Sequence, residues 1–251
     1  MPTPRQLRNP PIVEVAIDFR VKSRPAFQAA SFTEVHAAIR DRFPHERRQS
    51  LSQTVWKLSD EGSTGPVTTE RGLIGYHFLT ADERTIAQFR IDGFTYNRLA
   101  PYTRWEDVFP EAIELFERYT AIAQHEGIIR LAVRNINRID LPSQPFDLDR
   151  FFTAAPKVPE GLPQTIAGFL SRITIAGGGL ATAVHVTQAL EYRDSRAAVI
   201  LDIDAFRDFS VPPDDRAAIV QTFDSLRVFK NEVFFRHITD ECTQYLERES
   251  Q

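Results

Sequence analysis

Hydrophobic and polar residues alternate along several stretches of this chain, which is the pattern of a β-strand with one buried face. In the first of them, residues 12–21, five large apolar residues are separated by polar or small ones. Similar stretches follow at residues 54–59, 73–79, 85–92, 128–141, 171–175, 180–190 and 197–204. Their alternation and the short connections between them favour antiparallel strands, each with one side facing solvent.

Helices are predicted where apolar residues recur at intervals of three and four. Two segments, Ser31–Glu34 and Thr103–Glu106, match a capping box, in which a hydroxyl and a carboxylate bind free amides of the first turn. They predict one helix that stops at Pro44 and a second over residues 105–126, with Gly127 as its left-handed cap.

The second half of the chain has the same order of elements. A short helix is predicted over residues 146–154, and a long amphipathic helix from about residue 213 to the end. Each half, residues 1–127 and residues 128–251, would therefore be a β-α-β-β-β-α unit.

Two short matches support a duplication. Ile91–Phe94 and Ile203–Phe206 share an Ile-Asp pair, and each is predicted to end the last strand before a long helix. Ile17–Phe19 and Ile139–Leu141 share another Ile-Asp pair, and each lies late in the first strand of its half. The alternative is that Ile-Asp is simply common where a strand runs into a polar turn.

These elements predict an α+β fold, in which helices pack on one face of an antiparallel sheet. The two units either share one continuous sheet and form one domain, or pack as two lobes. In element order the architecture is helix-grip or TATA-binding-protein-like, a comparison of shape that carries no function.

Composition and charge narrow the classes of function. The net charge of −4 argues against nucleic acid or an anionic membrane as a general partner. No apolar run approaches the roughly 20 residues of a membrane-spanning helix, and residues 1–11 lack the apolar core of a secretory signal. The single cysteine, Cys242, excludes an intrachain disulfide framework, so a cytoplasmic location is expected.

Residues 134–138 are the most unusual segment of the chain. At strand spacing Arg134 and Arg138 share one face, whereas Asn135 and Asn137 share the other with apolar neighbours. One interpretation is a polar site whose arginines bind a phosphate or a carboxylate. The alternative is a ladder of arginines paired with acidic neighbours such as Asp202.

Two further segments have alternative interpretations. Asn97 and Arg98 could bind an anion together with the N-terminus of the following helix, or they could belong to a turn held by stacked aromatic rings. On the last helix Phe229, Phe234 and Phe235 extend the apolar surface beyond one face. That surface would contact a protein partner or a second copy, or it would be buried between the two halves.

Four segments together resemble a sporadically distributed family of uncharacterised bacterial proteins of about this length. They are Leu7–Glu14, Tyr96–Tyr102 with Trp105, Arg134–Ile139 and Lys230–Phe235. The resemblance implies no activity, cofactor or catalytic residue. The scattered occurrence of the family resembles that of accessory genes, such as defence or toxin–antitoxin loci.

The sequence contains no recognised catalytic, metal-binding or cofactor motif, so we assign no catalytic residue, metal or cofactor. Our first hypothesis is a non-catalytic interaction protein, for example an antitoxin or a defence component. The second is a small-molecule or nucleotide-binding domain with a pocket between sheet and helices, of which an enzyme would be a special case. The residues that would bind the ligand are Asn97, Arg98, Arg134, Asn135, Asn137 and Arg138.

Overall fold

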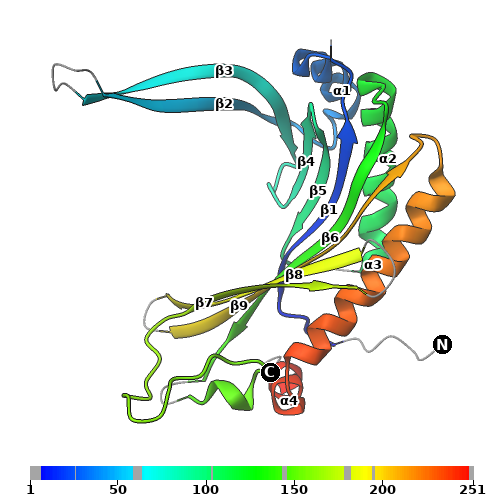
Figure 1. Cartoon of the computed structure of the whole chain (residues 1–251). Helices are drawn as coiled ribbons and strands as arrows, with labels where there is room; N and C mark the ends of the chain where they lie inside the picture. The colour runs from blue at the N-terminus through cyan, green and yellow to red at the C-terminus, as the bar shows by residue number, and fades with distance from the viewer. Residues whose placement is uncertain are drawn as a thin grey trace.

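A computed structural model describes residues 7–25, 27–58, 64–102, 104–142, 146–177, 182–193 and 196–248. Within residues 52–71 it describes the backbone alone. Nine strands within these ranges form one sheet (Figure 1). They are β1 (Ile12–Lys22), β2 (His45–Leu58), β3 (Thr64–Leu79), β4 (Thr85–Arg90), β5 (Gly93–Leu99), β6 (Gly127–Asp140), β7 (Leu170–Ala176), β8 (Thr182–Arg193) and β9 (Arg196–Val211). The helices are α1 (Phe32–Ile39), α2 (Trp105–Ala123), α3 (Arg216–His237) and α4 (Asp240–Arg248), with single 3-10 turns η1 (Ala29–Ser31) and η2 (Leu148–Arg150).

The sheet is antiparallel throughout, in the order β2-β3-β4-β5-β1-β6-β9-β8-β7. Its middle is the pair β1–β6, in which Ile17 lies opposite Val133. The expected α+β class is therefore confirmed, in the form of a single antiparallel sheet with helices against it.

The two faces of the sheet differ in chemistry because side chains alternate along each strand. α2 contacts β1 and β5, and α3 contacts β6 and β9, so these helices cover one face (Figure 1). Phe19 of β1 points to that face and is fully buried, stacked on Phe116 of α2 at 3.9 Å between ring centroids. The Phe19 ring also contacts Phe223 of α3, at 4.9 Å between ring centroids. This aromatic cluster joins both long helices to the centre of the sheet, and the opposite face carries mostly polar and charged residues.

Both ends of α2 differ from the sequence prediction. Thr103 lies outside the described residues, and the N-cap is Arg104, whose side chain makes no capping bond. The left-handed residue at the C-terminal end is Gln124 (φ 43°), whose amide donates to Thr120, whereas Gly127 begins β6. The turn closes before the glycine because β6 pairs with β1 from Gly127 onward. The first capping box was also wrong, since the Ser31 side chain makes no capping hydrogen bond.

The predicted strands and helices of each half needed four corrections. β5 was missed, because Asn97 and Arg98 were assigned to an anion site or to a turn and not to a strand. β3 begins at Thr64, well before the predicted stretch at residues 73–79, and the predicted helix over 146–154 is only the 3-10 turn η2. The single C-terminal helix is divided in two. Ile238 is extended and bridges to Phe152, and the Thr239 hydroxyl then accepts from the amide of Cys242 to cap α4.

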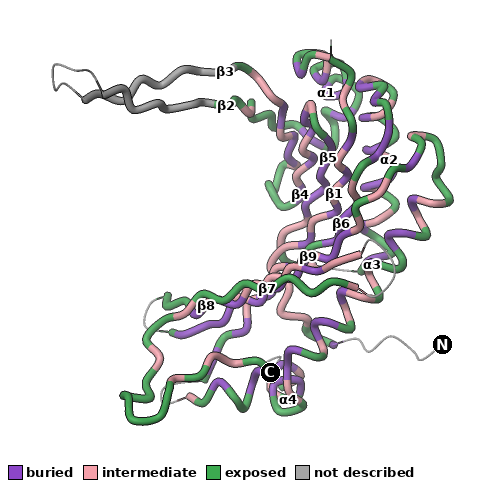
Figure 2. Tube along the Cα trace, in the orientation of Figure 1, coloured by how far each residue is buried: buried purple, intermediate pink, exposed green. Residues whose placement is uncertain are grey.

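The sheet ends in an edge strand that no helix covers. Every residue of β7 is exposed (Figure 2). The core lies instead under α1, α2 and α3, where the apolar side chains of β1, β5, β6 and β9 are buried. The candidate site described next lies at the margin of that core.

Candidate functional site

A pocket lies between the helix-facing side of the sheet and α3, where the N-terminal segment and the start of α2 also converge. Its cavity of about 120 Å³ is similar in size to engineered cavities of roughly 150 Å³ that hold benzene. It therefore accommodates a small molecule or one end of a larger one. The lining side chains come from five parts of the chain: Leu7, Pro10, Pro11 and Ile12; Tyr102, Arg104, Trp105 and Glu106; Asn135 and Asn137; Ile203; and Arg227, Lys230, Asn231, Phe234 and Phe235.

Asn135 and Asn137 of β6 form the polar part of the pocket floor. They point to the helix-facing side because they lie in register with Ile203 and Leu201 of β9, which are buried there. Asn137 Nδ2 donates to the Leu201 carbonyl at 2.9 Å. In the amide orientation that satisfies both of its polar atoms, Asn135 donates to the Arg134 carbonyl at 3.1 Å. Its oxygen then faces α3.

Lys230 of α3 lies directly above this floor. Its side chain is buried, and Nζ donates to Asn135 Oδ1 at 2.9 Å and to Asn231 Oδ1 at 2.8 Å. Among the residues that the structure describes, no carboxylate forms an ion pair with this amine. Burial, with a smaller contribution from the positive charge of Arg227, lowers the pKa of Lys230 to about 7. The amine is therefore partly neutral at physiological pH.

Arg227, one turn before Lys230, carries a second positive charge into the pocket. Its guanidinium lies over the Trp105 ring, 5.5 Å from the centroid, and pairs with Glu106 at 2.9 Å. Glu106 occupies the first turn of α2, and a hydrogen bond from its own amide, with the Arg227 charge, keeps its pKa below the ordinary value. Burial raises the pKa of Tyr102, also in the lining, to about 12.

The predicted site residues divide between the two faces of the sheet. Asn135 and Asn137 line the pocket, whereas Arg134 and Arg138 point to the opposite face, as their alternation requires. Arg134 pairs there with Asp202 at 2.6 Å, and Arg138 pairs with Asp140 and Glu191. The pairing of Arg134 with Asp202 is the one that the alternative interpretation of this segment predicts.

The other two predicted residues, Asn97 and Arg98, belong to β5 and do not line the pocket. Asn97 donates to Glu14 at 2.6 Å, and Arg98 donates to the Thr85 hydroxyl at 2.6 Å. They are hydrogen-bonded within the sheet, and the anion site proposed for them with the α2 N-terminus stays a prediction.

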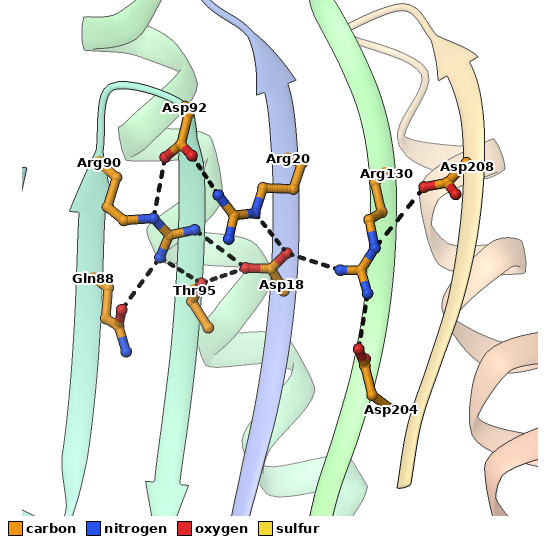
Figure 3. Close-up of polar contacts among 9 residues, drawn as sticks. All are labelled: Asp18, Arg20, Gln88, Arg90, Asp92, Thr95, Arg130, Asp204 and Asp208. Atoms are coloured by element: carbon orange, nitrogen blue, oxygen red, sulfur yellow. Dashed lines mark hydrogen bonds and ion pairs between the residues drawn. The ribbon is translucent and has the colours of Figure 1, made fainter. Parts of the chain in front are cut away.

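The open face of the sheet holds a network of ion pairs centred on Asp18 (Figure 3). Asp18 pairs with Arg90 at 3.2 Å, with Arg20 at 3.3 Å and with Arg130 at 3.3 Å. Arg130 continues the network to Asp204 at 2.9 Å. These side chains come from β4, β1, β6 and β9, so the charges drawn in Figure 3 compensate one another across the sheet. The pocket differs, because within the described ranges the partners of the Lys230 amine are two amide oxygens.

The aromatic residues predicted as a partner surface lie close to the pocket. Phe234 is buried, Phe235 is partly buried, and both line the cavity with their rings 5.2 Å apart. Phe229 is partly buried against the core. By contrast, Val228 of α3 is a large apolar side chain that is mostly exposed, at 65%.

Sequence reasoning missed Lys230, Arg227 and Glu106 as members of one site. A signal was nevertheless present, since each of the four segments that carry the family resemblance supplies lining residues. Comparison with protein-family models, with curated protein sequences and with solved structures gave no match. In the described part of the chain no group of three or more histidine, cysteine or acidic residues is arranged to hold a metal ion, and no helix is long and apolar enough to cross a membrane.

Proposed function

We propose that this protein is a binding protein whose pocket holds a small molecule through an anionic group, such as a carboxylate. The observation that carries the proposal is the buried amine of Lys230, which donates hydrogen bonds to two amide oxygens and has no carboxylate partner among the described residues. A buried charge that lacks a counter-charge costs several kcal/mol. An anionic ligand would supply that counter-charge and stabilise the protonated amine.

The charges around the cavity support the same kind of ligand. Arg104 and Arg227 line it with Lys230, and Glu106 is the acidic residue among the described lining. The local balance is therefore positive, although the whole chain has a net charge of −4. Aromatic and apolar side chains complete the walls, as in ordinary small-molecule sites.

The experiment is a thermal-shift and calorimetric titration with lactate, acetate and inorganic phosphate. An anion at 100 times its Kd stabilises the fold by about 2.7 kcal/mol, which raises Tm by about 5–10 °C for a chain of this size. We expect the shift in the wild type and in Lys157→Met, whose replaced lysine is exposed, and not in Lys230→Met.

The calorimetric titration adds a readout that locates the anion. Titrations at pH 8 in buffers of different ionisation enthalpy should show uptake of about one proton per anion, because the largely neutral amine becomes charged on binding. Anion binding without proton uptake, or an equal shift in Lys230→Met, would show that the anion does not reach Lys230.

We also propose that the halves 1–127 and 128–251 are related by duplication. The strand order β5-β1-β6-β9 supports this. The first strands of the two halves, β1 and β6, pair with each other, and each is flanked on its other side by the last strand of its own half, β5 or β9. The match between Ile91–Phe94 and Ile203–Phe206 does not, since the first spans the β4–β5 turn and the second lies inside β9.

A protein partner or homodimer contact on α3 stays a second proposal, as does a role in a defence or toxin–antitoxin locus. The exposed Val228 supports a contact at that helix. Phe234 and Phe235, however, are part of the pocket lining, so ligand binding and partner contact would use neighbouring parts of α3.

A further inference from the structure

The surroundings of Lys230 are those of a nucleophilic amine. Its Nζ donates hydrogen bonds to two neutral amide oxygens, those of Asn231 at 2.8 Å and Asn135 at 2.9 Å. The amine lines a cavity and is not enclosed in a filled core. Burial and the neighbouring Arg227 both favour its neutral form. These two effects, desolvation and an adjacent cation, are the ones that activate lysines for attack on carbonyl groups.

The choice of lysine at this position is informative because the chain uses arginine almost everywhere else. Of its 30 basic residues, four are lysines, at positions 22, 57, 157 and 230, which leaves 26 arginines. The Lys22 and Lys157 side chains are 68% and 70% exposed, whereas Lys230 is buried. Arginine remains charged at any physiological pH, but lysine can give up its proton when buried. A pocket that only required positive charge would be served by arginine.

We infer that Lys230 captures a small oxo acid, meaning an aldehyde or ketone that also carries a carboxylate, as an imine. The inference rests on the proposed anion-binding function. A simple anion would pair with Lys230, but the carboxylate of an oxo acid would be held by Arg227 or Arg104, the other cations of the lining, so that the neutral Lys230 meets the carbonyl carbon. The cavity of about 120 Å³ fits a molecule of the size of glyoxylate or pyruvate.

The step balances without an oxidant or a reductant. The neutral Nζ adds to the carbonyl carbon, forming a C–N bond, and a proton passes from nitrogen to the former carbonyl oxygen. That hydroxyl then leaves as water with the second hydrogen of the amine, and a C=N bond remains. The reverse addition of water releases the oxo acid and restores the amine, so the capture is reversible.

The test is reductive trapping. The wild-type protein is incubated with glyoxylate or pyruvate and sodium cyanoborohydride at pH 7.5, and the adducts are located by peptide mass spectrometry. We expect one adduct per chain, at Lys230, formed at least about tenfold faster than at Lys22 or Lys157. Lys157→Met should keep the adduct, and Lys230→Met should lose it while retaining its circular dichroism spectrum.

A second variant covers the case in which Lys230→Met does not fold. Arg227→Gln leaves the amine in place but removes a cation that would hold the carboxylate, so trapping of glyoxylate should fall about tenfold or more. Trapping of propanal, which has no carboxylate, should be slow in both proteins. Rapid trapping of propanal by the wild type would overturn the requirement for an acid.

The remaining outcomes separate this inference from the proposed function. If lactate raises Tm and no adduct forms at Lys230, the imine is overturned and anion binding stands. If adducts are spread over the lysines without preference, the imine at Lys230 is likewise overturned. If lactate and pyruvate leave Tm unchanged and no adduct forms, both the inference and the proposed function are overturned.

Discussion

Replacing Lys230 by methionine should change how the stability of the fold depends on pH. In the folded protein the pKa of Lys230 is lowered from 10.5 to about 7, while in the unfolded chain it returns to the higher value. Between these two pH values the unfolded state therefore holds one more proton than the folded state. The free energy of unfolding then rises with pH, by at most about 1.4 kcal/mol per pH unit.

The sign follows from the cost of burying the charged amine. Below pH 7 the folded protein carries the full penalty, and above about pH 10.5 the penalty disappears because the unfolded amine is also neutral. From pH 7 to pH 9 the wild type should gain about 2 kcal/mol over Lys230→Met. The charged or titratable neighbours contribute little to this change. Glu106, whose pKa is lowered, stays charged over the range, and Tyr102, with its pKa raised to about 12, stays neutral.

The measurement is chemical denaturation at pH 7, 8 and 9, followed by circular dichroism, for the wild type, Lys230→Met and Lys157→Met. Comparing pH dependences removes the constant cost of leaving the Asn135 and Asn231 oxygens without a donor, about 1–3 kcal/mol each. Lys157 is exposed, so its variant should follow the wild type at every pH. Parallel curves for the wild type and Lys230→Met would show that the buried amine stays charged, and the argument for its reactivity would be refuted.

Two other predictions concern parts of the fold outside the pocket. Arg90→Met should destabilise the protein by about 3 kcal/mol, because it leaves the nearly buried Asp18 without one of its cations. Arg236→Met, which breaks an exposed pair, should cost less than about 0.5 kcal/mol in the same denaturation assay, and equal losses would contradict this ranking. Burial raises the pKa of the Cys242 thiol to about 12, so Ellman's reagent at pH 8 should react with it only after denaturant is added. A rapid reaction in the native protein would contradict its burial.

The sequence predicted correctly those features that depend only on residues close together in one strand or helix. The alternation in residues 134–138 correctly separates Asn135 and Asn137 from Arg134 and Arg138, because strand geometry alone decides it. Assigning all four to one pocket ignored that same alternation. Arg98 was misplaced for a different reason. It lies within β5, a strand missed because its polar residues and the following proline are also typical of a turn.

The pocket itself depends on tertiary contacts that periodicity cannot supply. Lys230 occupies a helical position between aromatic residues, and nothing local distinguishes a buried lysine there from one that extends to solvent. Its burial requires the β6 floor and the first turn of α2, more than 90 residues away in the sequence. Only the four segments of the family resemblance linked these regions before the fold was known.

The pocket is lined by residues near both ends of the described chain, so it is complete only after α3 has been synthesised. Residues 7–12 are synthesised before the β6 floor, and residues 227–235 of α3 are the last lining residues to be made. All nine strands of the sheet precede α3 in the sequence, so they are synthesised while the Lys230 side of the pocket is still missing. Binding of the proposed anion would therefore report that α3 has packed against the sheet. A fragment that ends before Arg227 would contain all nine strands and would lack this wall of the pocket.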